Sequence, residues 1–306
     1  MSSPTTERLT PQRCSATSDA LDEPLAGTAS TVRSWLLLQH PGPWGRDAFV
    51  DGRHAVDGFG VELAARCAAA RVRPLLIRRV DRNLEPDRVT VFAIRSGPGE
   101  PRVERTSLAS TGDALSLDLE ALGRGESLGL EPHGDPLFLV CTHGRHDPCC
   151  VERGRPLAFA LAEVFPDATW ECSHLGGDRF AANVLVFPHG FVFGRVEPAV
   201  GERLARAYLD GRLSLEHLRG RTSVPMSAQF AERALREELE LDGIDEVRFE
   251  GASRAGDAVS VTFATPAGTA TVSLVVDAAS PRFLTCHSTH EEAPPTYRVT
   301  SILPPG

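Results

Sequence analysis

The chain has 306 residues, of which 42% are hydrophobic and 24% charged, a composition typical of folded proteins with two or three domains. Its formal net charge of −9 argues against nucleic acid and anionic membranes as general partners, because both attract basic surfaces. The opening MSSPTTERLTPQRCS lacks the apolar core of a secretory signal, and no apolar run approaches the roughly 20 residues that span a bilayer. Seven cysteines, an odd number without regular spacing, do not suit a disulfide framework. We therefore expect a cytoplasmic protein with reduced thiols.

The first 130 residues predict a flexible terminus followed by a small α/β unit. Residues 1–30 are rich in Ser, Thr, Pro and Asp, which is typical of flexible segments. In residues 31–130 the apolar patterns predict a buried strand at 35–39, a helix near 58–71, strands at 75–80 and 89–95, and a short helix at 113–122.

Residues 131–215 show the same order of elements more clearly. A buried strand ends at Cys141, and the next helix is predicted to begin near residue 154, with Pro156 in its first turn. The elements expected after it are strands at 168–172, 183–187 and 191–196, with 188–190 as a hairpin turn, and an amphipathic helix near 198–210. This order, strand–loop–helix–strand followed by a hairpin and a helix, is that of a thioredoxin-like domain. We interpret residues 31–130 as a degenerate copy of it without the cysteines.

Residues 216–306 predict a small C-terminal α+β extension. A strongly amphipathic helix begins near residue 225 and is expected to end at Gly243. Alternating apolar segments then predict an antiparallel sheet with strands at 246–250, 258–264, 269–276 and 296–302. The expected fold class is therefore α/β (α+β), with a thioredoxin-like domain in the centre.

Two segments about twenty residues apart hold the densest set of metal-binding side chains. CTHGRHDPCC (141–150) and WECSHLGGDRF (170–180) together contain four of the seven cysteines, three of the ten histidines and aspartate. The two glycines between His174 and Asp178 let the backbone curl tightly, so that both side chains can face one point. Thiolates, an imidazole and a carboxylate that converge on one place suit an iron–sulfur or a zinc site.

These motifs resemble those of the sucrase/ferredoxin-like family, and residues 137–196 resemble its thioredoxin-like ferredoxin domain. The matching pieces are CTHGRHDPCCVERG (141–154) and WECSHLGGDRFAANVLVFPHGFVFGR (170–195). The resemblance implies a [2Fe-2S] cluster held by two cysteines and two histidines. It maps Cys141 and Cys150 onto the cysteine ligands and His174 onto the first histidine, whereas Asp178 stands in the place of the second.

The departure at this position leaves four interpretations open. Asp178 ligates through an oxygen atom, or Cys172 supplies the fourth ligand, although it is expected to point to the other face of its strand. Cys149 is a third candidate, although it adjoins Cys150 and neighbouring cysteines rarely bind the same small cluster. In the fourth interpretation this chain has lost the cluster.

The function expected from the resemblance is electron transfer through one [2Fe-2S] cluster, in a redox carrier rather than a stand-alone enzyme, with an unidentified redox protein as its partner. Two alternatives keep the same fold: a thiol–disulfide oxidoreductase using Cys141, Cys149 or Cys150, and a structural zinc module. Sucrase activity is not supported, because glycoside hydrolysis needs paired carboxylates and no sugar cleft of paired acids and aromatic residues is visible.

The remaining chemistry-bearing residues are expected to have ordinary roles. Three are predicted to be buried in the core: Cys67, Trp170 and Phe180. His143 and His146 can hydrogen-bond the sulfurs, ligate a metal or face water, and the last is expected. Cys14 is expected to be incidental. Cys286 can form a separate metal site with His287 and His290, but a structural or surface role is expected. Arg179 either lies near the cluster or pairs with an acidic residue.

Overall fold

The computed structural model describes residues 13–54, 57–81, 88–97 and 100–305. The strands are β1 (Ser34–Gln39), β2 (Val72–Arg78), β3 (Val89–Arg95), β4 (Arg102–Leu108), β5 (Glu131–Pro132), β6 (Leu137–Cys141), β7 (Thr169–Cys172), β8 (Val184–Phe187), β9 (Phe191–Phe193), β10 (Leu218–Arg221), β11 (Arg248–Ala255), β12 (Ala258–Thr265), β13 (Gly268–Ala278) and β14 (Pro295–Leu303). The helices are α1 (Cys14–Ala20), α2 (Phe59–Ala69), α3 (Leu119–Arg124), α4 (Pro148–Val164), α5 (Pro198–Leu209) and α6 (Met226–Glu238), with short 3₁₀ helices η1 (Thr111–Ser116), η2 (Asp178–Phe180) and η3 (Leu215–His217). This mixed α/β architecture is the predicted fold class.

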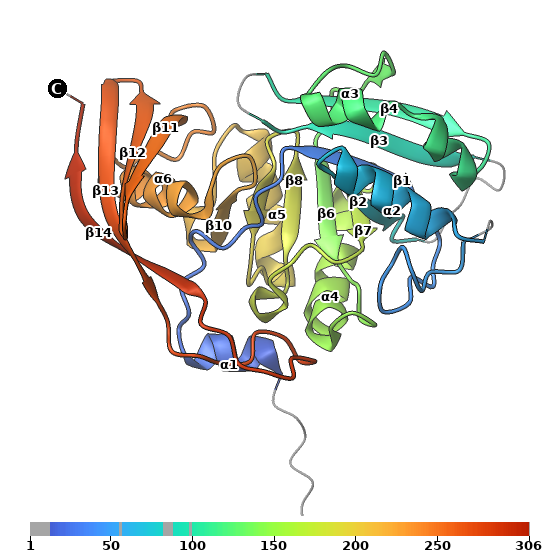
Figure 1. Ribbon diagram of the computed structural model, residues 1–306, viewed down its shortest axis with the longest axis horizontal. Helices are drawn as coiled ribbons and strands as arrows, with labels where there is room; N and C mark the ends of the chain where they lie inside the picture. The colour runs from blue at the N-terminus through green and yellow to red at the C-terminus, as the bar shows by residue number, and fades with distance from the viewer. Residues whose placement is uncertain (1–12, 55–56, 82–87, 98–99, 306) are drawn as a thin grey trace, which may run out of the picture.

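A ten-stranded mixed sheet, in the order β10-β9-β8-β6-β7-β2-β1-β3-β4-β5, runs through the centre of the molecule (Figure 1). In its second half, β6 and β7 are parallel and joined by α4, and β8 and β9 complete the order β7-β6-β8-β9. The first half repeats this arrangement as β2-β1-β3-β4, with α2 between its two parallel strands. The two halves meet where β2 pairs antiparallel with β7. The order predicted for a thioredoxin-like unit is therefore present in the second half and recurs in the first.

The inner faces of the two half-sheets pack against each other, and helices cover their outer faces. The Trp35 ring of β1 meets Phe187 of β8 edge-on at 5.5 Å, and Phe92 of β3 meets Trp170 of β7 at 5.8 Å. On the outer faces, α2 and α3 pack on the first half and α4 and α5 on the second (Figure 1). Because Cys141 belongs to the inner face, the end of β6 is enclosed between the two halves.

Helix α4 begins at Pro148, earlier than the sequence predicts, so Pro156 lies in its interior rather than in its first turn. Asp147 caps the helix, because its Oδ1 accepts the backbone N–H of Cys149 at 2.9 Å. Proline is well tolerated at the first helical position, where its missing N–H would have no partner inside the helix. Cys149 and Cys150 therefore stand in the first turn of a helix and not in the preceding loop.

The C-terminal region contains the predicted four-stranded antiparallel sheet, β11-β12-β13-β14, with α6 packed against it (Figure 1). Helix α6 ends at Glu238, so the prediction that it runs to Gly243 is wrong. The chain leaves the helix because Glu240 adopts the left-handed conformation, with a φ of 54°. In the first half, the single helix predicted at 113–122 is two short ones, η1 and α3, the second of which is capped by Asp118. Three strands, β4, β5 and β10, are not among the predicted ones.

Part of the N-terminal segment predicted to be flexible is packed against the rest of the protein, while residues 1–12 lie outside the described residues. Helix α1 lies against η2, the short helix that begins at Asp178. The buried carboxylate of Glu23 accepts hydrogen bonds from Ser18 Oγ at 3.0 Å and from Arg179 Nε at 2.8 Å. It also lies 2.6 Å from Arg282 Nη2, in the connection between β13 and β14. Glu23 therefore links the N-terminal segment to η2 and to the connection between β13 and β14. Of the two roles expected for Arg179, the structure shows the ion pair with an acidic residue.

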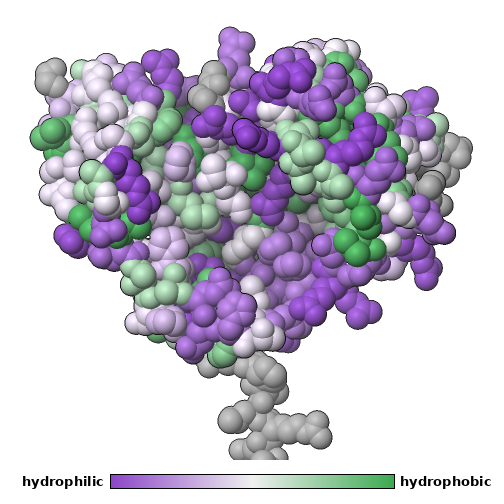
Figure 2. Space-filling view, viewed as in Figure 1, coloured by the Kyte–Doolittle hydropathy of each residue, from purple (hydrophilic) through white to green (hydrophobic). Residues whose placement is uncertain are grey.

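Exposed hydrophobic side chains are scattered over the surface of the described residues. Figure 2 shows hydrophobic residues in separate groups among hydrophilic ones on the face that it presents. The large exposed hydrophobic side chains belong to different parts of the fold: Leu21, Val50, Val61, Phe159, Leu209, Phe283 and Leu303. Among the helices of the described residues, none has the length and apolar composition needed to cross a bilayer.

Candidate metal centre

The end of β6, the first turn of α4 and the loop after β7 meet at one buried point. The ligand atoms of Cys141, Cys150 and His174 all lie within 4.8 Å of one another. Asp178 lies beside this group, because its Oδ1 lies 3.0 Å from Cys150 Sγ and 2.9 Å from His174 Nδ1. Together with His146 and His174 it forms a second, overlapping group of possible ligands. The structure thus brings together the four side chains that the sequence singles out, from three separate elements.

The side chain of Arg219, in β10, holds the loop that carries His174 and Asp178. Gly176 and Gly177 both adopt positive φ, 93° and 78°, a conformation that glycine reaches without steric cost. Arg219 donates from Nη1 to the carbonyl of Gly176 at 2.9 Å and to Asn183 Oδ1 at 2.8 Å. A Cβ atom at Gly177 would lie only 2.2 Å from Arg219 Nη2. The tight turn predicted from the two glycines is therefore present, and a buried arginine fixes it.

Hydrogen bonds and charges among the four side chains shift their pKa values. The hydrogen bond from Cys150 and the neighbouring His174 hold the pKa of the Cys141 thiol well below its usual value. Its hydrogen bond to Cys141 and its own burial raise the pKa of Cys150. Burial acts to lower the pKa of His174, but Asp178 and Cys141 raise it to about 9. Burial likewise acts against ionisation of Asp178, but His174 lowers its pKa. These shifts favour the thiolate form of Cys141 and the protonated form of His174.

Two arginines that the sequence analysis does not identify supply positive charge beside these anions. Burial lowers the pKa of Arg219 to about 9, which leaves the guanidinium charged at neutral pH. Arg73 of β2 donates from Nη2 to the carbonyl of His174 at 3.1 Å. Both come from strands outside the two cysteine motifs, so only their position in the fold connects them to the site.

The two alternative ligands lie in different places. Cys172 is the register neighbour of Cys141 across β6 and β7, and it belongs to the same buried inner face. The prediction that it points to the other face of its strand is therefore wrong, although its sulfur is not part of the group within 4.8 Å. Cys149 is directed away from Cys150, and its sulfur lies 3.5 Å from that of Cys14. Cys14 and Cys286, for which ordinary roles are expected, both have their sulfurs beside that of Cys149.

Of the two histidines in the 141–150 segment, His143 differs from the expectation that it faces water. His143 is buried, with Nε2 2.9 Å from the carbonyl oxygen of Gly45, so it does not face water. His146 is half-buried, and its ring stacks on that of His174 at 3.7 Å between centroids. The loop after β1 therefore closes over the site from the first half of the sheet. Three predicted core residues are indeed buried: Cys67, Trp170 and Phe180.

His174 is the part of the site nearest to solvent. Its side chain keeps 24% of its exposure, against 2% for Asp178. A depression of about 150 Å³ opens beside it, lined by His143, His146 and His174 together with residues of the loop after β1. The imidazole side is therefore the most accessible side of the centre.

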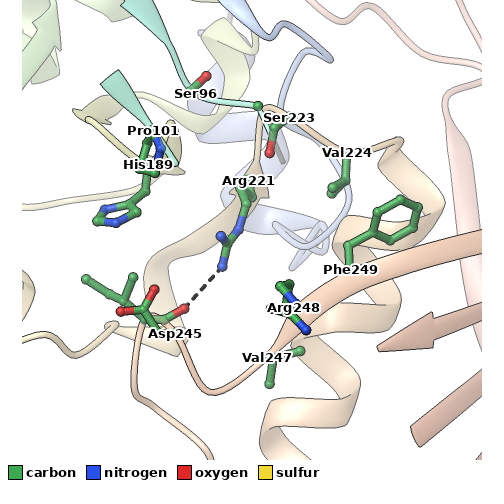
Figure 3. A pocket seen from close by; sticks show the side chains of 12 residues that line it. Ser96, Pro101, His189, Arg221, Ser223, Val224, Asp245, Val247, Arg248 and Phe249 are labelled. Atoms are coloured by element: carbon green, nitrogen blue, oxygen red, sulfur yellow. Dashed lines mark hydrogen bonds between the residues drawn. The ribbon is translucent and has the colours of Figure 1, made fainter. Parts of the chain in front are cut away.

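A separate pocket of about 200 Å³ lies between the edge of the large sheet and the segment that leads into β11 (Figure 3). His189, Asp245 and Phe249 line it, and Arg221 donates from Nη2 to the carbonyl of Ile244 at 3.2 Å. None of the four predicted ligands lines this pocket, so it is not part of the candidate centre.

Comparison with known proteins agrees with the family resemblance of the two motifs. The sequence profile of the sucrase/ferredoxin-like family matches residues 25–220, which include both halves of the ten-stranded sheet. A search of curated proteins finds no match. Among solved structures, a variant of the thioredoxin-like [2Fe-2S] ferredoxin from Aquifex aeolicus is 18% identical, with a TM-score of 0.24, over 28% of this chain and 97% of that one. Since the family profile spans well over half of the chain, this protein belongs to the sucrase/ferredoxin-like family.

Proposed function

We propose that this protein is an electron-transfer protein carrying one [2Fe-2S] cluster, held by Cys141, Cys150, His174 and Asp178. The observation that supports it is the convergence of two thiols, an imidazole and a carboxylate at one buried point. Cysteine thiolates are the usual ligands of iron–sulfur clusters, and histidine replaces them in the Rieske type. When bound, such a cluster supplies one-electron redox chemistry.

The residues of this centre suit an anionic metal group. Metal ligands must lose their protons, and the lowered pKa of Cys141 favours its thiolate form. Cys150 and His174 release their protons when a metal takes them. Arg219, Arg73 and the N-terminus of α4 offset the negative charge that two thiolates and a carboxylate bring into the interior.

Asp178 is the fourth ligand that the geometry favours. Its carboxylate lies within 3.0 Å of Cys150 Sγ and of His174 Nδ1, whereas Cys172 belongs to none of the metal-binding groups found among the described residues. Cys149 is turned toward other cysteines. Histidine ligation raises the potential from about −400 mV for an all-cysteine plant-type cluster toward the Rieske range of about −150 to +300 mV. An anionic carboxylate favours the oxidised state and draws that value partly back.

The redox partner in this proposal docks at the depression beside His174. This imidazole is the most exposed of the four ligands, so the shortest path between the cluster and a docked protein passes through it. All seven cysteines are free thiols, which suits the reducing cytoplasm that the composition predicts.

A thiol–disulfide oxidoreductase is the second candidate, because Cys141 and Cys150 form a hydrogen-bonded thiolate–thiol pair. Both side chains are only 1% exposed, however, and a substrate disulfide must reach the attacking sulfur directly. Electron transfer has no such requirement, since an electron can pass through the imidazole. We therefore favour the cluster.

Anaerobic purification followed by iron and sulfide analysis tests the proposal. We expect about two irons and two acid-labile sulfides per chain and the red-brown colour of a [2Fe-2S] protein. Cys141→Ser and Cys150→Ser should each abolish or severely destabilise the cluster, while the matched control Cys67→Ser, a buried cysteine in α2, should leave the visible spectrum unchanged. The proposal is contradicted if freshly prepared wild-type protein contains no acid-labile sulfide but does contain zinc, and if this zinc is lost in the Cys141→Ser variant.

A further inference from the structure

A second group of metal-binding side chains lies on the other side of the same helix turn. The sulfurs of Cys14, Cys149 and Cys286 form a nearly equilateral triangle, with distances of 3.5 Å, 3.4 Å and 3.5 Å between them. Asp147 faces this triangle, since its Oδ2 lies 3.7 Å and its Oδ1 3.9 Å from Cys14 Sγ. All four ligand atoms are within 4.8 Å of one another.

These residues come from three distant parts of the chain. Cys14 opens α1, Asp147 and Cys149 begin α4, and Cys286 lies in the long connection between β13 and β14. Figure 1 shows α1 and this connection side by side below α4. Asp147 and Cys149 are completely buried, Cys14 is 6% exposed, and Cys286 is partly exposed at the edge of the group.

The distances suit one metal ion held by four ligands. In a tetrahedral zinc site with Zn–S bonds of about 2.3 Å, neighbouring sulfurs lie about 3.8 Å apart. The observed sulfur distances are a few tenths of an ångström shorter and far longer than the S–S bond of about 2.05 Å in a disulfide. Three thiolates and a carboxylate leave no open position, which is typical of structural rather than catalytic zinc.

Hydrogen bonds already orient these side chains for such a role. The Asp147 carboxylate is fixed by the backbone N–H groups of Cys149 at 2.9 Å and Cys286 at 2.7 Å. The backbone N–H of Cys14 donates to the sulfur of Cys286 at 3.4 Å. Donors of this kind hold metal ligands in place from outside, and the N-terminus of the 17-residue helix α4 favours the negative charge of a thiolate at Cys149.

We infer that Cys14, Cys149, Cys286 and Asp147 form a tetrahedral site for one zinc ion, separate from the proposed iron–sulfur centre. The neighbours Cys149 and Cys150 then serve different metals from one helix turn. The zinc ion ties the start and the end of the described chain to α4, beside the ion pairs of Glu23 with Arg179 and Arg282. Zinc is redox-inert, so this site holds the segments around the electron-transfer centre in place without exchanging electrons.

Zinc analysis of matched cysteine variants tests the inference. Protein produced with added zinc should contain about one zinc per chain in the wild type, in Cys67→Ser and in Cys141→Ser, because the last two changes spare the second group. Cys286→Ser should lose most of the zinc, and since this side chain is partly exposed the variant is expected to fold. In Cys141→Ser, cobalt in place of zinc should give the sulfur-to-cobalt charge-transfer absorption of a tetrahedral thiolate site, and Cys286→Ser should abolish it in that background.

The outcomes separate this inference from the proposed function. Iron and sulfide report on Cys141 and Cys150, whereas zinc that survives Cys141→Ser reports on the second group. A Cys141→Ser protein that binds neither zinc nor cobalt overturns the inference, as does a Cys286→Ser protein that keeps a full zinc ion. Loss of two titratable thiols with a matching mass decrease, and no bound metal, would instead identify a disulfide and also refute the site. In the wild type, a mercurial reagent should release the zinc in proportion to the thiols that it modifies.

Discussion

Substitution of Gly177 by alanine tests whether Arg219 holds the metal-binding loop rigidly. At a φ of 78° an alanine pays about 1–2 kcal/mol for the left-handed conformation. Its Cβ would also lie 2.2 Å from Arg219 Nη2. A free arginine end would simply move aside, but here Nη2 donates to the carbonyl of Thr28 at 2.6 Å, and Nη1 donates to Gly176 and Asn183.

Displacing this guanidinium breaks at least one buried hydrogen bond of a charged group, which costs about 1.5–3 kcal/mol. We therefore expect Gly177→Ala to lower the free energy of unfolding by about 2.5–5 kcal/mol, the sum of the two terms. Gly129→Ala is the matched control, because Gly129 has a similar φ of 68° and open space around its Cβ position.

The assay is urea denaturation of both variants and the wild type, prepared in parallel. The control should lose only about 1–2 kcal/mol, the conformational cost alone. If the two variants lose the same stability within about 0.5 kcal/mol, Arg219 yields freely and the argument for a rigid loop fails. The iron content of Gly177→Ala should also fall below that of the control, because the displaced loop carries His174 and Asp178.

Three further predictions address the ligands and the buried charges. Asp178→Ala should lose the cluster or leave it labile, whereas Cys172→Ala should keep it; absorbance and electron paramagnetic resonance decide, and the reverse pattern removes Asp178 from the ligand set. In metal-free protein, NMR titration should show that His174 stays protonated until pH about 9, and Asp178→Asn should lower that pKa; an unchanged titration contradicts the ion pair. Glu232→Gln should cost about 3–5 kcal/mol at pH 7, because it leaves Arg236 buried without its carboxylate at 3.0 Å. The pKa of Glu232 is lowered by its arginine partners against the effect of burial, so the wild-type advantage is present above pH 4.5 and lost as the pH falls below it. The exposed Glu237→Gln on the same helix should cost less than about 1 kcal/mol at either pH, and an equal cost for both would refute the buried pair.

Much of the local structure is decided by the sequence itself. The apolar run that ends at Cys141 predicts a buried strand, and the alternating pattern of the last sixty residues predicts the four-stranded sheet that the structure contains. The start of α4 was also predictable, because Asp147 is a suitable N-cap and Pro148 a suitable first helical residue. Assigning Pro156 to the first turn instead placed the predicted start near residue 154. His174 and Asp178 are four residues apart in one loop, so their proximity follows from local geometry.

Tertiary structure alone decides which distant residues share a site. The packing of one half-sheet on the other brings Arg73 and the loop after β1 to the centre, and β10 places Arg219 beneath it. Cys14 and Cys286 are 272 residues apart, and each resembles an isolated cysteine in the sequence. They meet because the tertiary fold packs α1 and the connection between β13 and β14 onto the start of α4. The hydrophobic effect that drives such packing is non-directional, so no pattern in the sequence identifies which distant segments will pack together. Motifs within one loop are therefore readable from the chain, whereas a site assembled from three segments emerges only when the core has formed.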